Sequence, residues 1–218
     1  MEENKVLKVL KPLNRCLSLL SIALGIVAII VLVGYNFADV FTIITDEGTK
    51  YADKFSYPGW QSIYAGVGNM IIQGYTEATF NIWTCLGNLL PIFGCIVACV
   101  MLATNFLRRG TNLKKAILEG IVGVLLIFGA IVLFNCDKLW IANAKAVTGS
   151  YTYYYEAYLE PALNGELYFA KDTYPTIVLA VCLSAGLLKL VNCGMLLFQK
   201  YYARSVNKQN FRIEEKGE

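Results

Sequence analysis

Four long apolar stretches divide the chain. They cover residues 17–34, 83–107, 116–134 and 174–198. Each is close to or above the ~20 residues that a helix needs to cross a hydrocarbon core about 30 Å thick. Because lipid offers the backbone no hydrogen-bond partners, each stretch must satisfy its own N–H and C=O groups, which favours helix. The pattern therefore predicts four transmembrane helices.

The segments between these stretches indicate one membrane domain. Tails at 1–16 and 199–218 flank the first and last helices, and two long segments occupy 35–82 and 135–173. A short turn at 108–115 makes the second and third helices antiparallel neighbours. We expect an all-α integral membrane protein, a four-helix transmembrane bundle with two extracytoplasmic loops forming a small cap.

Aromatic residues are dense in both long loops, with a tyrosine-rich run at 151–158. Such side chains either sit among lipid headgroups or pack two loops together. Their position in the middle of the loops favours the cap. The stretch 67–75 fits a strand or a helix, and 151–163 is compatible with a short surface helix.

The distribution of charged residues predicts how the bundle is oriented in the membrane. Only 16% of the residues are charged, against about a quarter in soluble domains. Lys and Arg gather in the tails and in the 108–115 turn, whereas acidic residues outnumber them in the long loops. The positive-inside rule then places both termini in the cytoplasm of a multi-pass plasma-membrane protein. The first stretch is too long for a signal peptide and lacks a cleavage site, so we expect an uncleaved anchor.

The chain lacks the residues and motifs that several classes of enzyme need. Histidine, the commonest general base and metal ligand, is absent from the chain. H-E-x-x-H, G-x-S-x-G and P-loop motifs are missing as well. We therefore expect no enzyme, no catalytic residue, no metal and no cofactor. Basic residues are not interleaved with aromatic ones on one surface, so nucleic acid is not an expected partner.

The seven cysteines lie in or beside the apolar stretches, unlike a secreted disulfide framework. Cys95 and Cys99, four residues apart, are expected to be small packing residues. Cys85 and Cys136 fall at adjoining outer ends of the second and third helices. For this pair, a disulfide and two free thiols both remain open.

Two charged residues interrupt the apolar stretches, at a cost of about 2.5–3.5 kcal/mol each near mid-membrane. Counted at 1.5 Å per residue from the cytoplasmic ends, Glu119 lies about 9 Å deep and Lys189 roughly 14 Å deep. Long side chains can close that offset, so we predict an interhelical ion pair with Asn192 as a third member. The alternative is that Lys189 reaches the interface alone while Glu119 caps the N-terminal dipole of its helix. Asn88 is expected to hydrogen-bond a neighbouring helix and completes the predicted intramembrane polar set.

The first long loop contains the segment Tyr57-Pro58-Gly59-Trp60-Gln61. It resembles a motif in the first outer loop of uncharacterised four-span membrane proteins of Gram-positive bacteria, and the similarity extends to residues 88–91. This resemblance implies a bacterial plasma-membrane location and no particular activity. The layout is also similar to claudin-type tetraspan proteins, but as architecture only, because the loop lacks their Gly-Leu-Trp element and cysteine pair. Pro58-Gly59 indicates a turn that presents Trp60 or, alternatively, lets it anchor the loop.

These features favour a non-enzymatic interaction, structural or accessory component of the membrane. It would contact a membrane-protein partner or a second copy of itself through its outer loops or a bundle face. The alternative is a small transporter or channel subunit that works as an oligomer. In that case Glu119, Lys189 and Asn192 would line a polar path.

Overall fold

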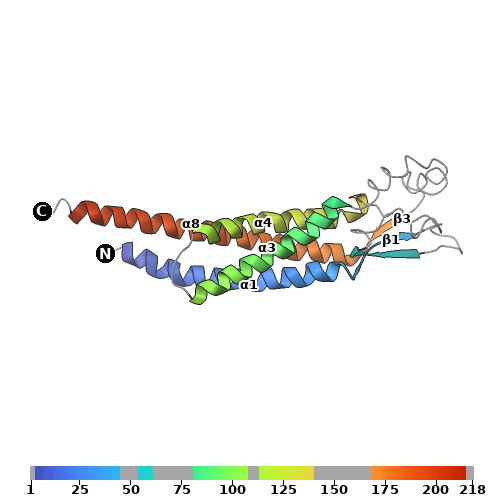
Figure 1. The fold of residues 1–218 in the computed structure, drawn as a ribbon, viewed down its shortest axis with the longest axis horizontal. Helices are drawn as coiled ribbons and strands as arrows, with labels where there is room; N and C mark the ends of the chain where they lie inside the picture. Colours follow the sequence, from blue (N-terminus) through green and yellow to red (C-terminus); the bar gives the residue numbers. More distant parts are fainter. Residues whose placement is uncertain (1–2, 45–53, 61–80, 108–112, 140–167, 215–218) are drawn as a thin grey trace.

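The computed structural model describes residues 3–44, 54–60, 81–107, 113–139 and 168–214. The long helices of this part of the chain are α1 (Glu3–Tyr35), α3 (Ile82–Leu107), α4 (Leu113–Phe134) and α8 (Thr173–Glu214). They form an elongated bundle with a small sheet at one end and both chain termini at the other (Figure 1). We call these ends the sheet end and the terminal end.

Each long helix contains a stretch that is long and apolar enough to cross a membrane. These stretches are Lys8–Tyr35, Ile82–Thr104, Leu113–Phe134 and Thr173–Tyr202. Large apolar side chains on the outside of the bundle, such as Ile30, Phe93 and Val124, are more than half exposed. So much apolar surface is an aggregation hazard in water, whereas lipid tails solvate it. The prediction of four apolar spanning helices is confirmed, and it supports a multi-pass membrane protein.

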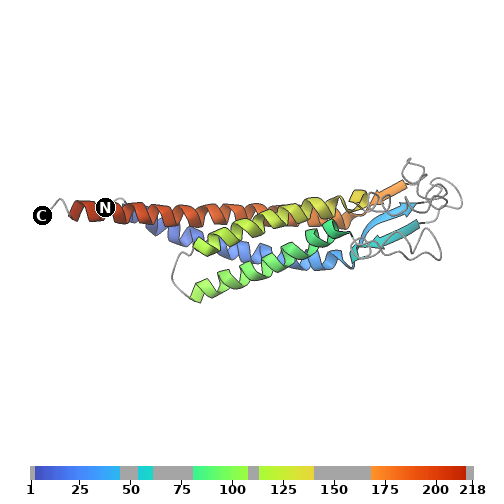
Figure 2. The same ribbon diagram turned by 45° about the horizontal axis from the view of Figure 1, so that its top comes forward.

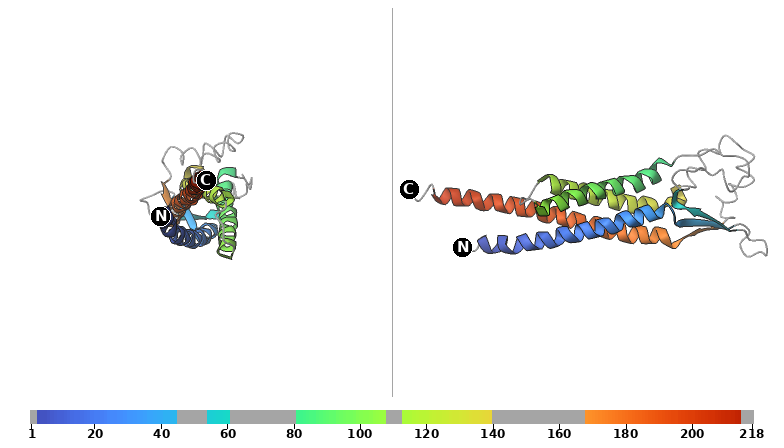
Figure 3. Two further views of the ribbon diagram at one scale, coloured as in Figure 1. Left: turned by 90° about the vertical axis from the view of Figure 1, so that its left-hand side faces the viewer. Right: turned by 60° about the horizontal axis from the view of Figure 1, so that its bottom comes forward.

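Two helices continue well beyond the predicted spans. α1 begins at Glu3 instead of residue 17, and α8 continues to Glu214 instead of ending at 198. At 1.5 Å per residue α8 is about 60 Å long, roughly twice the hydrocarbon thickness. Both project past α3 and α4 at the terminal end (Figure 3). The predicted tails are therefore largely helical, because hydropathy marks where an apolar run ends and not where a helix ends.

A three-stranded antiparallel sheet lies at the sheet end. Its strands are β1 (Asp39–Ile44), β2 (Lys54–Pro58) and β3 (Tyr168–Lys171), in the order β2-β1-β3. One sheet thus joins both long loops (Figure 2). This corrects the expectation of an all-α fold. The predicted elements at 67–75 and 151–163, and most of the aromatic cap, lie outside the described residues.

Short connections hold the sheet on the bundle. Only residues 36–38 separate α1 from β1, and only Asp172 separates β3 from α8. Lys171 Nζ lies 3.4 Å from Asp137 Oδ1 and 3.9 Å from the ring centroid of Phe134, at the end of α4. The direction of the sheet therefore follows from the direction of the helices.

Tyr57, the first residue of the YPGWQ segment, is part of the core of this junction. Its ring stacks on Phe41 of β1, with centroids 4.8 Å apart and planes 16° from parallel. Both rings are buried, and burial raises the pKa of Tyr57 to about 12. The tyrosine therefore stays neutral and contributes apolar packing between the first two strands.

Backbone hydrogen bonds from Gly59 and Trp60 hold the end of β2 against the residues that follow α1. The Gly59 N–H donates to the Ala38 carbonyl and the Trp60 N–H donates to the Asn36 carbonyl, both at 3.0 Å. The Trp60 side chain is 44% exposed, so the segment presents its indole at the surface. Gln61 lies outside the described residues.

Replacing Gly59 by alanine should weaken this junction. A Cβ at this position would overlap the backbone carbonyl of Tyr35, which cannot rotate away as a side chain can. We expect Gly59→Ala to lower the free energy of unfolding by about 1–3 kcal/mol, the usual range for overpacking. Denaturant unfolding in detergent measures it, with Ser56→Ala on the exposed side of β2 as the control. Equal stability of the two variants would contradict the packing described here.

Glycines also allow the helix backbones to touch at two crossings. A Cβ on Gly123 of α4 would lie 2.9 Å from the carbonyl oxygen of Gly186 on α8, and the converse holds. A Cβ on Gly129 of α4 would overlap the carbonyl of Gly87 on α3. Close approach of small residues is a common way for membrane helices to associate.

Candidate functional site

α1 and α8 each bury one line of residues spaced alternately three and four apart, the spacing of a coiled-coil seam. Toward the sheet end these residues are apolar or small, and toward the terminal end they are polar. On α1 the line is Asn14, Ser18, Ser21, Gly25, Ala28, Leu32 and Tyr35. On α8 it includes Val178, Cys182, Ala185, Lys189, Asn192 and Gln199. Packing these helices together therefore concentrates polar side chains in one half of the bundle.

An ion pair lies at the boundary between the two halves. Lys189 Nζ of α8 is 3.0 Å from Glu119 Oε1 of α4, and the two side chains are 0% and 1% exposed. Lys189 also donates to Ser21 Oγ of α1 at 3.1 Å. One charged contact thus joins three helices.

The second carboxylate oxygen of Glu119 has its own donors. Ser21 Oγ donates to Glu119 Oε2 at 2.5 Å, and Asn192 Nδ2 donates to it at 3.1 Å. Ser18 Oγ donates in turn to Asn192 Oδ1 at 3.4 Å. We call these five residues, Ser18, Ser21, Glu119, Lys189 and Asn192, the polar cluster.

The completeness of the polar cluster explains how it can exist in a bundle interior. Burying each ion of a pair costs several kcal/mol, which attraction offsets only when further hydrogen bonds satisfy the remaining positions. None of the five side chains has a buried nitrogen or oxygen without a partner in the described structure. The polar cluster is therefore a closed network that fixes α1, α4 and α8 in one register.

Three of the four predicted polar residues meet in this network. They are Glu119, Lys189 and Asn192. Lys189 is fully buried and paired with Glu119. The alternative, in which Lys189 reaches the interface alone and Glu119 caps its helix, is therefore wrong. Asn88 of α3 lies elsewhere, donating to the Leu32 carbonyl of α1 at 3.1 Å. Its Oδ1 has no partner among the described residues.

Sequence reasoning missed the serines as members of the network. Neither Ser18 nor Ser21 was predicted to take part in a polar contact. The available signal is their spacing of three, followed by Gly25 and Ala28, which places them on the buried line of α1. One turn toward the terminal end, the Asn14 amide donates to Gln199 Oε1 and extends the polar contacts between α1 and α8.

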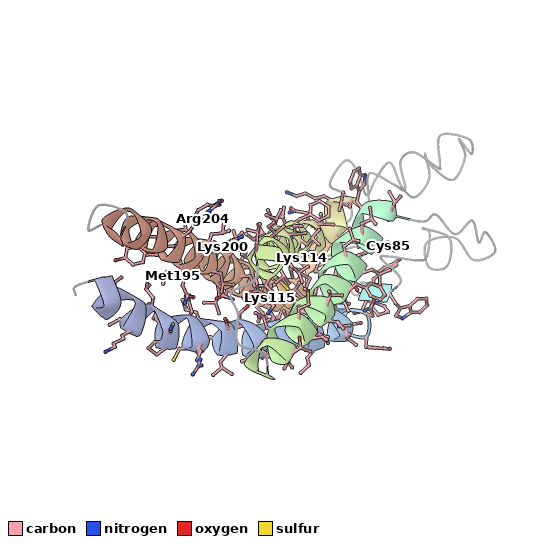
Figure 4. All side chains as sticks on the ribbon, turned by 60° about the vertical axis from the view of Figure 1, so that its left-hand side comes forward. Cys85, Lys114, Lys115, Met195, Lys200 and Arg204 are labelled. Atoms are coloured by element: carbon pink, nitrogen blue, oxygen red, sulfur yellow. The ribbon has the colours of Figure 1, made fainter. Side chains whose placement is uncertain are left out.

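The cysteines are free thiols throughout the described residues. Cys85, at the sheet end of α3 (Figure 4), and Cys136, just beyond α4, are not joined by a disulfide in the described structure. The Cys136 side chain instead hydrogen-bonds Tyr35 of α1, and burial raises its pKa to about 11. Cys99 donates to the Ile22 carbonyl at 3.8 Å, consistent with a packing role.

Within the described ranges, no group of three or more His, Cys, Asp or Glu side chains is arranged to hold a metal ion. No model of a known protein family matches the chain, and no curated protein sequence matches it significantly. The geometry of the bundle and its sheet is therefore the basis for inferring a function.

Proposed function

We propose that this protein is a non-enzymatic interaction component of a bacterial plasma membrane, with both termini in the cytoplasm. It binds another membrane protein or a second copy of itself through its outer surface. The distribution of basic residues supports the orientation. The resemblance of residues 57–61 to four-span proteins of Gram-positive bacteria supports the location.

The observation that carries this proposal is the fixed mounting of the sheet. β1 and β3 are neighbours in the sheet, and each is joined to a spanning helix by a very short connection. The Lys171 contacts to Asp137 and Phe134 tie β3 to the end of α4 as well. A preorganised surface loses less conformational entropy on binding than a mobile loop does, which favours recognition. A mere connector between helices needs no such construction.

Two exposed aromatic side chains mark the surface for this contact. Phe37 is 79% exposed and Trp60 is 44% exposed, and both lie where the sheet meets the bundle. Aromatic residues are enriched at protein interfaces because they combine a large apolar area with few rotatable bonds. We therefore assign the partner contact to the region around Phe37 and Trp60.

Site-specific photo-crosslinking in living cells tests this assignment. A photoreactive residue at position 60 should give a discrete cross-linked protein species, and Phe37→Ala should weaken it. The same reactive residue at position 93, an exposed point on α3 within the apolar span, is the matched control and should label lipid alone. Lipid labelling alone at position 60 would contradict the proposal.

A second candidate function, a transporter or channel subunit, is favoured by one observation. Polar side chains line the buried seam from Lys189 to Asn14 and Gln199, in the direction of the terminal end. In an oligomer that rearranges, this line could become part of a polar path. Solute or ion flux into liposomes carrying the wild type or Lys189→Leu separates the functions. Flux lost in the variant supports transport, and its absence from the wild type counts against it.

A further inference from the structure

The first turn of α4 and the neighbouring part of α8 form a second polar region, separate from the polar cluster. The two helices run antiparallel, with Gly120 beside Cys193, where a Cβ on the glycine would lie 3.1 Å from the sulfur. One turn nearer the terminal end, this register brings residues 113–116 level with residues 196–200. Arg204 follows one turn later on α8.

Basic side chains gather at this place. Figure 4 shows Lys114 and Lys115 of α4 near the end of that helix, with Lys200 and Arg204 on the adjoining part of α8. Lys114 and Arg204 are exposed, Lys200 is half-buried and Lys115 is 9% exposed. We call these four residues the basic site.

Lys115 is the unusual member of the basic site. Its side chain is about nine-tenths buried, yet it makes no hydrogen bond or ion pair to any described residue. The nearest carboxylate on the same face of α4 is Glu119, which is engaged with Lys189 at 3.0 Å. Its Nζ is not one of the buried polar atoms that lack a partner, so the stem is covered by protein while the ammonium reaches the surface. The charge is therefore open to an anionic ligand.

The end of α4 adds to the attraction. The first N–H groups of a helix have no partner within the helix and carry the positive end of its dipole, which suits a phosphate. The first turn of α4 contains no acidic residue that would supply this charge internally. The basic site and the helix end therefore place positive potential in one location.

The depth of the basic site identifies the source of the anion. The apolar span of α4 starts at Leu113 and that of α8 ends at Tyr202. The site therefore lies where hydrocarbon gives way to headgroups. We propose that it binds the phosphate of an anionic lipid in the leaflet at the terminal end of the bundle.

Lipid retention measured by native mass spectrometry tests the proposal. The protein is reconstituted in a mixture of phosphatidylglycerol and phosphatidylcholine. When it is released into the spectrometer, it should retain bound phosphatidylglycerol. Each cation removed should lower the affinity about five-fold, so Lys115→Gln with Lys200→Gln should lower it about thirty-fold. Lys115→Arg should preserve it. Circular dichroism checks that each variant is folded. If the double variant does not fold, Lys200→Gln alone is measured in its place and should lower the affinity about five-fold.

The matched control removes two charges from the same end of the molecule. Lys8→Gln with Lys11→Gln changes exposed residues of α1 and should leave retention unchanged. An equal loss in this control would show a diffuse positive surface and overturn the proposal. Inorganic phosphate distinguishes the source: displacement of the lipid by phosphate at comparable concentration would mean that a free anion is the ligand, which also overturns it.

Discussion

Lys189→Leu should destabilise the bundle by about 3–5 kcal/mol, the cost of breaking a buried ion pair by removing one partner. The leucine leaves the Glu119 carboxylate in the interior, where only Ser21 and Asn192 still donate to it. It also removes the donor that joins α8 to Ser21 of α1. Reversible unfolding in mixed detergent micelles measures the free energy.

The double variant Glu119→Leu with Lys189→Leu separates the ion pair from simple packing. It should lose clearly less stability than Lys189→Leu alone, because no unpaired charge remains inside the bundle. Lys8→Leu, on the exposed face of α1, is the control for removing a lysine and should have little effect. Strictly additive effects of the two buried substitutions would show that Glu119 and Lys189 do not stabilise one another.

The second large effect is expected at the crossing of α3 and α4. A Cβ on Gly129 would overlap the Gly87 carbonyl and lie 2.8 Å from Pro91 Cγ, and neither group can turn aside. Gly129→Val should therefore force the helices apart and lower the free energy of unfolding by about 3 kcal/mol or more. Gly194→Ala on α8 is the matched control, since a Cβ there meets nothing within 4 Å. If both variants unfold alike, the crossing is not as close as described.

The spans and the ion pair were predictable because lipid imposes few solutions. A backbone in hydrocarbon must be helical here, which gives the four segments from hydropathy alone. Charged residues in such segments are expensive and need a partner, and the chain has only Glu119 and Lys189 at comparable depth. The partners of that pair were harder to predict. A serine in a membrane helix can bond to its own backbone, so Ser18 and Ser21 carry little signal until the register of α1 is known.

The sheet was not predictable by the same reasoning. β1 is a short apolar strand that follows a long apolar helix after only residues 36–38, so its β-branched residues merge with the end of the helical pattern. Its neighbour β3 comes from a segment more than a hundred residues further along the chain. Such a pairing depends on how the bundle brings the ends of α1 and α8 together, which no local pattern contains.

The neighbouring strand β2 also shows that local sequence does not reveal a residue's partner in the fold. The YPGWQ segment indicates a turn at Pro58-Gly59, but Pro58 is the last residue of β2 and Gly59 is needed for close approach to Tyr35. The residue types Pro58 and Gly59 indicated a special backbone position. Only the three-dimensional structure shows that Tyr35 is the neighbour that requires a glycine there.

The arrangement of the chain across the membrane is tested most directly by thiol labelling in sealed membrane vesicles with an impermeant reagent. A Cys16→Ser background removes the one exposed native cysteine, and the other six are buried or half-buried. One new cysteine at a time is then placed at Lys8 near one terminus, at Ser205 near the other or at Ser56 on β2, all exposed positions. Four crossings predict that Lys8→Cys and Ser205→Cys react from one side and Ser56→Cys only from the other. Reaction of the two terminal positions from opposite sides, or of all three from one side, would contradict the account.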